Sequence, residues 1–432
     1  MKLKTLVRFV LLTILLVTIG CDEKAASTPT AIVGSSPTAT SVLPTATTAY
    51  SEKAAPTPTA IVGETPAQSP PAPSPLPPTD IPEPTPATVD YTPVEMPDWE
   101  VSTPADERLD PELVADLYRY AAKKPSLYGL LLVKNGRLIA EGYFNGGAIE
   151  QRAVLASVTK SYTSALVGIA LAQGCLSSVD QTMIEFFPEF ADEIDDPRKE
   201  QITIGDMLKM RSGYPWEEHT PPYLDALFSN NDWLPNMVEF PLTGDPGTEF
   251  GYSNLTAHLL GVIVARACNT SLLSFGQQHL FSPIGARVGA WPRDAHGYYY
   301  GLGDISFTAR DVAKFGLLYL NDGEYAGNQV VPAAWVSDSL QTYSENLYNN
   351  QVGSYFRQIG YGYLWWSARA GDHRFNYAWG HGGNLIVLLD DLDMVIVTTA
   401  NPLHGIWGDE AWQKEGAIID LVGWFIQSLP KE

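Results

Sequence analysis

The sequence is poor in cysteine, in histidine and in positive charge, and each of these shortages narrows the kinds of site, partner or cross-link that the protein can have. Its 432 residues hold seven histidines, with no His-Glu-x-x-His motif and no Cys/His cluster at metal-ligand spacing, so we expect no metal site. Only 27 Lys and Arg stand against 49 Asp and Glu, and the formal net charge of −22 argues against a nucleic acid or an anionic membrane surface as partner. Of the three cysteines, Cys175 and Cys268 either form one disulfide outside the cell or remain as buried thiols.

The first 21 residues have the pattern of an export signal. Three basic residues among the first eight precede an apolar run over residues 9–19, which is too short for a comfortable membrane span. The run ends just before Cys21, and together they resemble a bacterial lipoprotein signal, in which this cysteine becomes the lipid-modified first residue. Thr18, three residues before the cysteine, departs from the leucine that is usual there. The alternatives are an ordinary exported protein and a retained N-terminal anchor. Each of them puts the bulk of the protein outside the cytoplasm.

A segment rich in Pro, Thr, Ala and Ser follows, over residues 22–106. It holds more than half of the 33 prolines, and it contains a near-duplicate, because residues 23–34 recur as residues 52–63. Such a composition cannot bury enough apolar surface to offset the entropy lost on ordering. We therefore predict a disordered linker, extended and partly polyproline-like, that acts as a passive spacer or as a glycosylated stalk.

The remaining residues, 107–430, have an ordinary globular composition and are ample for a large core. Asn135-Gly136 between two apolar runs predicts a β-hairpin. Strands at both ends and helices in the middle predict an α+β fold, in which one antiparallel sheet flanked by helices is completed by both ends of the domain and a helical insert forms a groove against it. The hydrophobic pattern predicts helices over 157–173, 255–267, 306–321 and 410–429, and strands over 128–133, 138–144, 362–367, 374–379, 385–389 and 394–399.

The most informative local pattern is Ser-x-x-Lys, which opens the first of these helices with Ser157 and Lys160. Two side chains three residues apart lie on one helix face, so the amine can take a proton from the hydroxyl. Ser157 is expected in the first turn, where unpaired backbone N–H groups favour negative charge. Lys160 is expected to face the core, where desolvation lowers its pKa and lets it act as a base. The motif alone is unspecific, since it recurs at residues 428–431, and the alternative is an N-cap serine with a surface lysine.

Tyr-x-Asn supplies possible partners and occurs at residues 143–145, 252–254 and 348–350. We interpret the first and third copies as incidental, because one ends a hairpin strand and the other lies in a polar loop. The middle copy stands in a tight turn that leads into an apolar helix. Tyr252 near the lysine would be a phenol whose deprotonation the cation favours, and Asn254 would hydrogen-bond a substrate amide or the lysine. The alternative is a packed tyrosine and an N-capping asparagine.

A third pattern, Gly-His-Gly-Gly-Asn, ends at Asn384 and opens a predicted strand. Gly382 and Gly383 would allow a substrate backbone to approach the strand edge closely. The N–H of Asn384, together with that of Ser157, is expected to form an oxyanion hole. His381 would bind a carboxylate or orient its neighbours; a lone histidine at a glycine turn is more often structural.

The Ser-x-x-Lys, Tyr-x-Asn and His-Gly-Gly patterns occur in the order typical of serine β-lactamases and penicillin-binding proteins. Over residues 128–401 the chain resembles their class C-like, β-lactamase-related serine hydrolases. The resemblance implies a β-lactamase/transpeptidase-like fold and covalent acyl transfer, with Ser157 as nucleophile and Lys160 and Tyr252 as a shared general base. True β-lactamases often carry Lys-Thr-Gly as the third motif. His381 in place of that lysine points instead to the esterase, D-amino-acid peptidase and 6-aminohexanoate-dimer hydrolase branches.

We therefore predict an exported, monomeric serine hydrolase that cleaves small-molecule ester, amide or D-peptide bonds and requires neither metal nor organic cofactor. Its predicted location is extracytoplasmic, anchored to the bacterial cell membrane through a lipid on Cys21. The absence of a Gly-x-Ser-x-Gly elbow argues against a Ser-His-Asp mechanism. The alternative is a non-catalytic penicillin-binding sensor or peptidoglycan-binding lipoprotein of the same fold. Four aromatic residues either line the groove or belong to the core: Trp216, Tyr361, Trp365 and Trp366.

Overall fold

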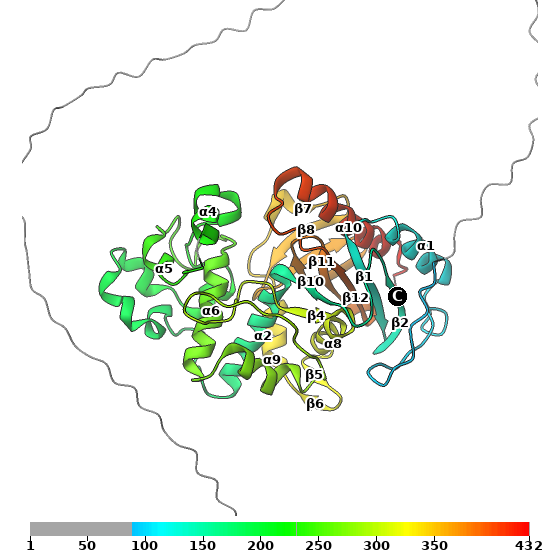
Figure 1. Cartoon of the computed structure of the whole chain (residues 1–432), viewed down its shortest axis with the longest axis horizontal. Helices are drawn as coiled ribbons and strands as arrows, with labels where there is room; N and C mark the ends of the chain where they lie inside the picture. The colour runs from blue at the N-terminus through cyan, green and yellow to red at the C-terminus, as the bar shows by residue number, and fades with distance from the viewer. Residues whose placement is uncertain (1–88, 230, 432) are drawn as a thin grey trace, which may run out of the picture. The chain divides into compact units, whose positions relative to one another are not determined.

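An antiparallel sheet of eight strands lies at the centre of the described structure (Figure 1). The computed structural model describes residues 89–229 and 231–431, so the predicted signal peptide with Cys21 and most of the predicted linker lie outside the described residues. The sheet has the order β2-β1-β12-β11-β10-β9-β8-β7, which confirms the predicted α+β class and the contribution of both chain ends to one sheet. The strands are β1 Leu127–Lys134, β2 Arg137–Tyr143, β7 Gln351–Val352, β8 Phe356–Tyr361, β9 Trp366–Ala370, β10 His373–Gly380, β11 Asn384–Leu389 and β12 Met394–Ala400.

The β1–β2 hairpin turns at Asn135 and Gly136, as the sequence predicted. Their φ angles are +51° and +74°, and a two-residue type I′ turn requires positive φ at both positions, which Asn-Gly supplies with little strain. Strand β1 also pairs antiparallel with the last strand, β12, over its whole length. The hairpin therefore ties the start of the domain to its C-terminal strands.

Helices cover both faces of the sheet. Gly142 of β2 faces Tyr118 of α1, whereas Gly129 of β1 faces Ala309 of α8. Because Gly142 pairs with Leu130, the neighbour of Gly129, and side chains alternate along a strand, α1 and α8 lie on opposite faces. Helix α10 packs beside α1, and α8 also lies along β11 and β12. This double cover explains why β11 and β12 are buried along their whole length and mostly apolar.

A mostly helical stretch separates the short paired strands β3 and β4, and Figure 1 shows its helices α4, α5 and α6, in green, grouped beside the sheet. Among the described helices, none is by itself long and apolar enough to cross a membrane; α6 and residues 272–281, bent by 78°, pass that test only as a pair. The remaining bounds are α1 Pro111–Ala121, β3 Arg152–Val154, α2 Thr159–Ala172, α3 Ile204–Leu208, α4 Pro221–Ser229, α5 Asn236–Glu239, α6 Asn254–Ala267, α7 Leu272–Gly276, β4 Ser306–Thr308, α8 Ala309–Leu320, β5 Glu324–Tyr325, β6 Asn328–Gln329, α9 Ala333–Leu340 and α10 Gly408–Ser428.

Two of the predicted elements differ from the structure in type or in continuity. The first three residues of the predicted helix 306–321 form β4 instead, and α8 begins after Thr308, whose hydroxyl caps the helix. The predicted strand 362–367 is interrupted, because the chain turns between β8 and β9 with Leu364 at φ +59°. In both places a local turn or cap overrides the apolar pattern on which the prediction depended.

The folded domain begins earlier than the predicted boundary at residue 107. Residues 89–106, which were expected to belong to the linker, run along β2. The N–H of Leu138 donates to the carbonyl of Glu100 at 2.9 Å, and the N–H of Ser102 donates to the carbonyl of Leu138 at 3.0 Å. Trp99 is buried in the core. Composition alone misplaced the boundary, because backbone pairing does not depend on the Pro and Thr content around it.

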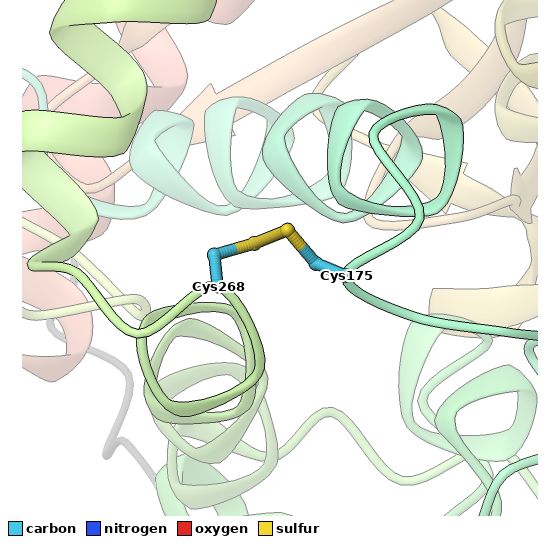
Figure 2. Close-up of a disulfide and its surroundings, with 2 residues drawn as sticks. All are labelled: Cys175 and Cys268. Carbon is cyan, nitrogen blue, oxygen red and sulfur yellow. A yellow bond between two sulfur atoms is a disulfide. The ribbon is translucent and has the colours of Figure 1, made fainter.

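Cys175 and Cys268 form a disulfide, which decides between the two states that the sequence left open (Figure 2). Cys175 follows the C-terminal end of α2, and Cys268 directly follows the C-terminal end of α6. These two helices also pack against each other. The bridge therefore links the helix that begins after the Ser-x-x-Lys serine to the helix that begins at the Tyr-x-Asn asparagine.

Candidate active site

Ser157 lies on a 3₁₀ turn, Ala156–Val158, immediately before α2 and not within the helix as predicted. Ala156 has φ +46°, a left-handed conformation that is strained for a residue with a Cβ and that is often found at functional sites. Gly380 packs against this turn so closely that a Cβ there would lie 2.2 Å from the carbonyl oxygen of Leu155. The turn is thus held between α2 and the end of β10, with Ser157 at the edge of a cavity.

Lys160 is buried beneath Ser157, and three acceptors surround its amine. Nζ lies 2.9 Å from Oγ of Ser157, 2.8 Å from Oδ1 of Asn254 and 2.8 Å from the carbonyl oxygen of Leu302. A neutral amine that donates to the amide and to the carbonyl keeps its lone pair for the hydroxyl proton of Ser157. Burial lowers the pKa of Lys160 to about 8, against the opposing effect of nearby carboxylates, so roughly a tenth of the amine is neutral at pH 7 and half at about pH 8.

Tyr252 lies beside this pair, but its ionisation differs from the prediction. Nζ of Lys160 is 4.9 Å from the centre of the Tyr252 ring. Burial raises the pKa of Tyr252 well above its usual value, and the hydrogen bond with Ser157 lowers it only in part. The sequence predicted that the lysine would favour a phenolate; the structure instead gives a neutral phenol. Such a group can donate a proton and receive another, which suits a relay better than a base.

A buried carboxylate that the sequence analysis did not single out supports the Tyr-x-Asn motif. Ser253 caps α6 by accepting the N–H of Thr256 at 3.1 Å. Glu217 accepts the Ser253 hydroxyl at 2.8 Å and the backbone N–H groups of Asn254 and Leu255 at 2.9 and 3.1 Å. Burial raises the pKa of Glu217 to about 7. Helix N-termini favour such an acceptor. Here Glu217 holds Asn254 in the position in which the Asn254 side chain contacts Lys160.

His381 lines the cavity, but it has no free nitrogen with which to bind a substrate carboxylate. Its Nδ1 lies 2.9 Å from Oε2 of Glu415, and its Nε2 lies 2.8 Å from the carbonyl oxygen of Ile406. The imidazole stacks on Trp407, with 4.7 Å between ring centroids. Of the two roles predicted for His381, the contacts favour orienting its neighbours.

The glycines and the asparagine of the third motif serve packing and not the cavity. A Cβ on Gly382 would lie 1.8 Å from the carbonyl oxygen of Asn401, and one on Gly383 would meet Ile418 of α10, so their space is filled by the protein itself. Asn384 is fully buried, donates to the carbonyl of His381 and accepts from the N–H of Ala400. None of these three residues lines the cavity.

The register of β10 points to another oxyanion donor than the predicted Asn384 N–H. The carbonyl of Gly380 accepts the N–H of Gly383 at 3.1 Å and therefore faces β11. Backbone groups of successive strand residues point to alternate edges, so the N–H of His381 faces the opposite edge, where the Ser157 turn lies. The backbone N–H groups of Ser157 and His381 are thus the candidate oxyanion donors.

The cavity beside Ser157 has a volume of about 370 Å³ and a wall of aromatic and acidic side chains. Tyr348, which the sequence analysis interpreted as incidental, contributes to this wall and packs against Trp366 and Trp379. No lysine or arginine side chain of the described residues lines it. Nor do residues 89–229 and 231–431 contain a group of three or more His, Cys, Asp or Glu side chains that could hold a metal ion. The acidic members of the wall are Glu218, Asp225, Asp304 and Glu415.

The four aromatic residues that the sequence left undecided divide between wall and core. Trp366 lines the cavity, and its ring stacks on Tyr252 with 5.5 Å between centroids. Trp216 is half-buried and packs behind Tyr252. Tyr361 and Trp365 are buried in the core.

Comparison with known proteins gives the following likenesses. The family model described as "Beta-lactamase" matches residues 120–418. The 6-aminohexanoate-dimer hydrolase of Paenarthrobacter ureafaciens is 28% identical over 273 residues, which cover 59% of this chain and 68% of that protein. Beta-lactamase-like protein 2 of Dictyostelium discoideum is 23% identical over 250 residues, half of this chain and 44% of that protein. A proposed 6-aminohexanoate-dimer hydrolase from Bacillus anthracis has the same fold, with a TM-score of 0.57, 21% identity, and coverage of 80% of this chain and 90% of the other.

Proposed function

The chain belongs to the Beta-lactamase family, and on this premise we propose that it is a serine hydrolase that cleaves an ester or amide bond through an acyl-enzyme on Ser157. One observation carries the proposal. The amine of Lys160 lies 2.9 Å from the Ser157 hydroxyl, while two oxygen acceptors at 2.8 Å fix its remaining hydrogens. The geometry of the pair therefore supports Lys160 as the base that activates Ser157.

Acylation begins when neutral Lys160 takes the hydroxyl proton of Ser157, whose Oγ attacks the carbonyl carbon of the substrate. The carbonyl oxygen becomes an oxyanion, and the backbone N–H groups of Ser157 and His381 stabilise it; each such donor is worth about 3–4 kcal/mol. The phenol of Tyr252 then gives its proton to the departing alcohol or amine as the carbon–heteroatom bond breaks. The Lys160 ammonium returns a proton to Tyr252. In deacylation, water takes the place of the leaving group and the same steps run in reverse.

The cavity supports a small, uncharged acyl group as substrate. The aromatic wall of Trp366, Trp379 and Tyr348 suits apolar contact, and the described part of the chain places no lysine or arginine in the lining for a substrate carboxylate. The relative from Paenarthrobacter ureafaciens is named for an amide substrate, so amides, D-peptides and esters all belong to the proposed class. We place simple esters first and β-lactams last, since β-lactam antibiotics carry a carboxylate.

We further propose that the protein is exported as a monomer and anchored to the cell membrane through a lipid on Cys21. The signal-like N-terminus supports this, and so does the Cys175–Cys268 disulfide, because disulfides persist mainly in oxidising compartments. Replacing Cys21 by serine is expected to move the protein from the membrane fraction to the soluble extracytoplasmic fraction. Unchanged fractionation of the Cys21→Ser variant would argue against the lipid anchor.

The catalytic proposal is tested with a p-nitrophenyl ester and the Ser157→Ala variant. Wild-type protein should show a burst of p-nitrophenol followed by turnover, and the variant should lose at least about a thousandfold in kcat with an unchanged circular dichroism spectrum. Retained turnover in Ser157→Ala would refute the nucleophile. Labelling wild type with a fluorescent penicillin or a fluorophosphonate adds a second readout. A stable adduct without any hydrolysis would favour the non-catalytic sensor.

A further inference from the structure

A carboxylate of the C-terminal helix, Glu415 of α10, holds one wall of the cavity, although the proposed acyl transfer assigns it no role. Glu415 is only 5% exposed. Its Oε1 accepts the indole N–H of Trp379 at 2.6 Å, and its Oε2 accepts the backbone N–H of Gly382 at 2.7 Å and lies 2.9 Å from Nδ1 of His381. All three donors belong to residues 379–382, where β10 ends. A single side chain from another element thus fixes this short segment at three points.

The second nitrogen of His381 completes the arrangement. Nε2 lies 2.8 Å from the carbonyl oxygen of Ile406, and a carbonyl can only accept a hydrogen bond. Both ring nitrogens therefore face acceptors, which an imidazolium satisfies with two N–H donors. The charge of the imidazolium is matched by Glu415, so the buried carboxylate is paired as well as hydrogen-bonded.

The end of β10 needs such support, because it has a strand neighbour on one edge only. Pairing with β9 stops at Tyr377, whereas pairing with β11 continues to Gly380. Beyond Tyr377 the open edge meets the Ser157 turn, and it is this edge that the N–H of His381 faces. No ladder hydrogen bond to β9 fixes the orientation of that peptide group. The contacts of Glu415 with residues 379–382 fix the orientation of this peptide group instead.

We propose that Glu415 is a positioning residue for acyl transfer: it anchors residues 379–382 to α10, so that the N–H of His381 points at the developing oxyanion. The inference rests on the proposed function, since it concerns the same acylation of Ser157. Glu415 acts through His381 and Gly382 and does not touch the reacting atoms. Oxyanion donors are effective only when they are preorganised, so loss of this anchor should weaken binding of the transition state.

The ion pair also links the arrangement to pH. Burial lowers the pKa of His381, but the contacts with Glu415 and with the Ile406 carbonyl outweigh it, so the pKa lies above its usual value. Glu218, which also lines the cavity, favours the charged form of the ring through its negative charge. Asp304 and His404, 3.7 Å apart, are further titratable groups that line the cavity. Deprotonation of His381 removes one of its two donors, so the anchor weakens as the pH rises above that pKa.

The test compares Glu415→Gln with a matched variant on the same helix, Glu410→Gln. Glu410 is exposed, and among the residues that the structure describes it pairs only with Lys414. We expect Glu415→Gln to lower kcat/KM for p-nitrophenyl acetate by about tenfold or more, while Glu410→Gln stays at the wild-type value. The affinity for phenylboronic acid, which forms a tetrahedral adduct on a serine hydroxyl, should fall by the same factor. If Glu415 had only a structural role, Glu415→Gln would lower the fraction of folded protein, but the folded protein would keep its kcat/KM and its affinity for the boronic acid.

A second readout follows His381 directly, by its proton NMR signal in the otherwise inactive Ser157→Ala background. Adding Glu415→Gln to that background should lower the pKa of His381, whereas adding Glu410→Gln should not. If Glu415→Gln fails to fold, Glu415→Asp carries the boronate test, because its shorter side chain withdraws the carboxylate from residues 379–382. Wild-type boronate affinity in a folded Glu415 variant, or an unmoved His381 titration in Glu415→Gln, would overturn the inference. If wild type itself neither labels nor turns over, the proposed function has failed, and the inference with it.

Discussion

At the scale of single residues, the amine of Lys160 sets the pH at which the candidate site can act. Burial is the main cause that lowers its pKa to about 8, and Glu218, Glu217 and Asp304 oppose this by favouring the ammonium. Only the neutral amine accepts the proton of Ser157, so the acylation rate should rise as the pH rises through about 8. The carboxylates at the cavity therefore keep the base more protonated than burial alone would.

Replacing Glu218 by glutamine should shift this rise to lower pH. Removing a negative charge destabilises the ammonium of Lys160, which lowers its pKa, while glutamine keeps an oxygen for the side-chain amide of Asn254. The measurement is kcat/KM for a p-nitrophenyl ester across the neutral and alkaline range. Glu239→Gln, an exposed position on α5, serves as control. If the rise of kcat/KM in Glu218→Gln stays at the wild-type pH or moves to higher pH, the assignment of Lys160 as base is contradicted.

Several residue-scale predictions could be made from sequence, because they depend on short spacing. The Ser-x-x-Lys spacing predicted the proximity of Ser157 and Lys160, and the expected core-facing position of Lys160 predicted the lowered pKa of its amine. The direction of the Tyr252 shift could not be predicted, since it depends on aromatic rings that come from distant segments, such as Tyr361 and Trp366. The same holds for Tyr348, whose place in the wall depends on the fold and not on its neighbours in sequence.

At the scale of elements, packing decides what a helix position tolerates. Gly168 lies within α2, where alanine would be favoured by about 1 kcal/mol on helix propensity alone. A Cβ at this position, however, would lie 2.3 Å from the indole ring of Trp335 in α9. The indole N–H of Trp335 donates to the carbonyl of Ser164 at 3.0 Å, so the ring cannot move away without losing that bond.

Gly168→Ala should therefore destabilise the protein, against the helix propensity, by about 1–3 kcal/mol of the free energy of unfolding. Urea denaturation followed by circular dichroism measures the change. Gly205→Ala in α3 is the matched control, since a Cβ there meets no atom closer than 3.4 Å, an ordinary contact. Equal or greater stability of Gly168→Ala would show that α9 adapts to the added methyl group.

Elements whose signals are local could be predicted from sequence, and those set by pairing could not. The β1–β2 hairpin follows from Asn135-Gly136, and the periodic pattern located α6 and α10 to within about two residues. Strand β4 was mistaken for helix, because only its pairing with β3 distinguishes these three residues, Ser306–Thr308, from a helical turn. The choice of oxyanion donor depends on pairing in the same way: strand register, which favours the His381 N–H over the predicted Asn384 N–H, cannot be read from a short motif.

At the scale of the whole domain, long-range contacts join segments that are far apart in sequence. The guanidinium of Arg310 in α8 reaches Asp98 at 2.8 Å and also binds Glu141 of β2, so it fastens residues before the predicted boundary to the core. The predicted class, a sheet completed by both ends, could be derived from the order of strands and helices. The exact start of the domain could not, because it depends on this buried ion pair and on pairing along β2.

The Cys175–Cys268 disulfide is the covalent counterpart of these contacts, and its contribution can be measured. It closes a loop with a sequence separation of 93, for which loss of chain entropy in the unfolded state predicts a stabilisation of about 4.5 kcal/mol. The double variant Cys175→Ala/Cys268→Ala should lose about this free energy of unfolding in urea. Reducing agent should destabilise the wild type to a similar degree and leave the double variant unchanged.

Activity should respond differently from stability in this experiment. The bridge lies at the C-terminal ends of α2 and α6, whereas Ser157 and Asn254 lie at their N-terminal ends, about 20 Å away along helices of this length. The contacts of Lys160 with Ser157 and Asn254 do not involve the bridge. The folded double variant should therefore keep a kcat within about twofold of wild type at low temperature and lose activity earlier on heating. A large loss of kcat in the folded variant would mean that the bridge, and not the packing of α2 on α6, sets the distance between the two motifs.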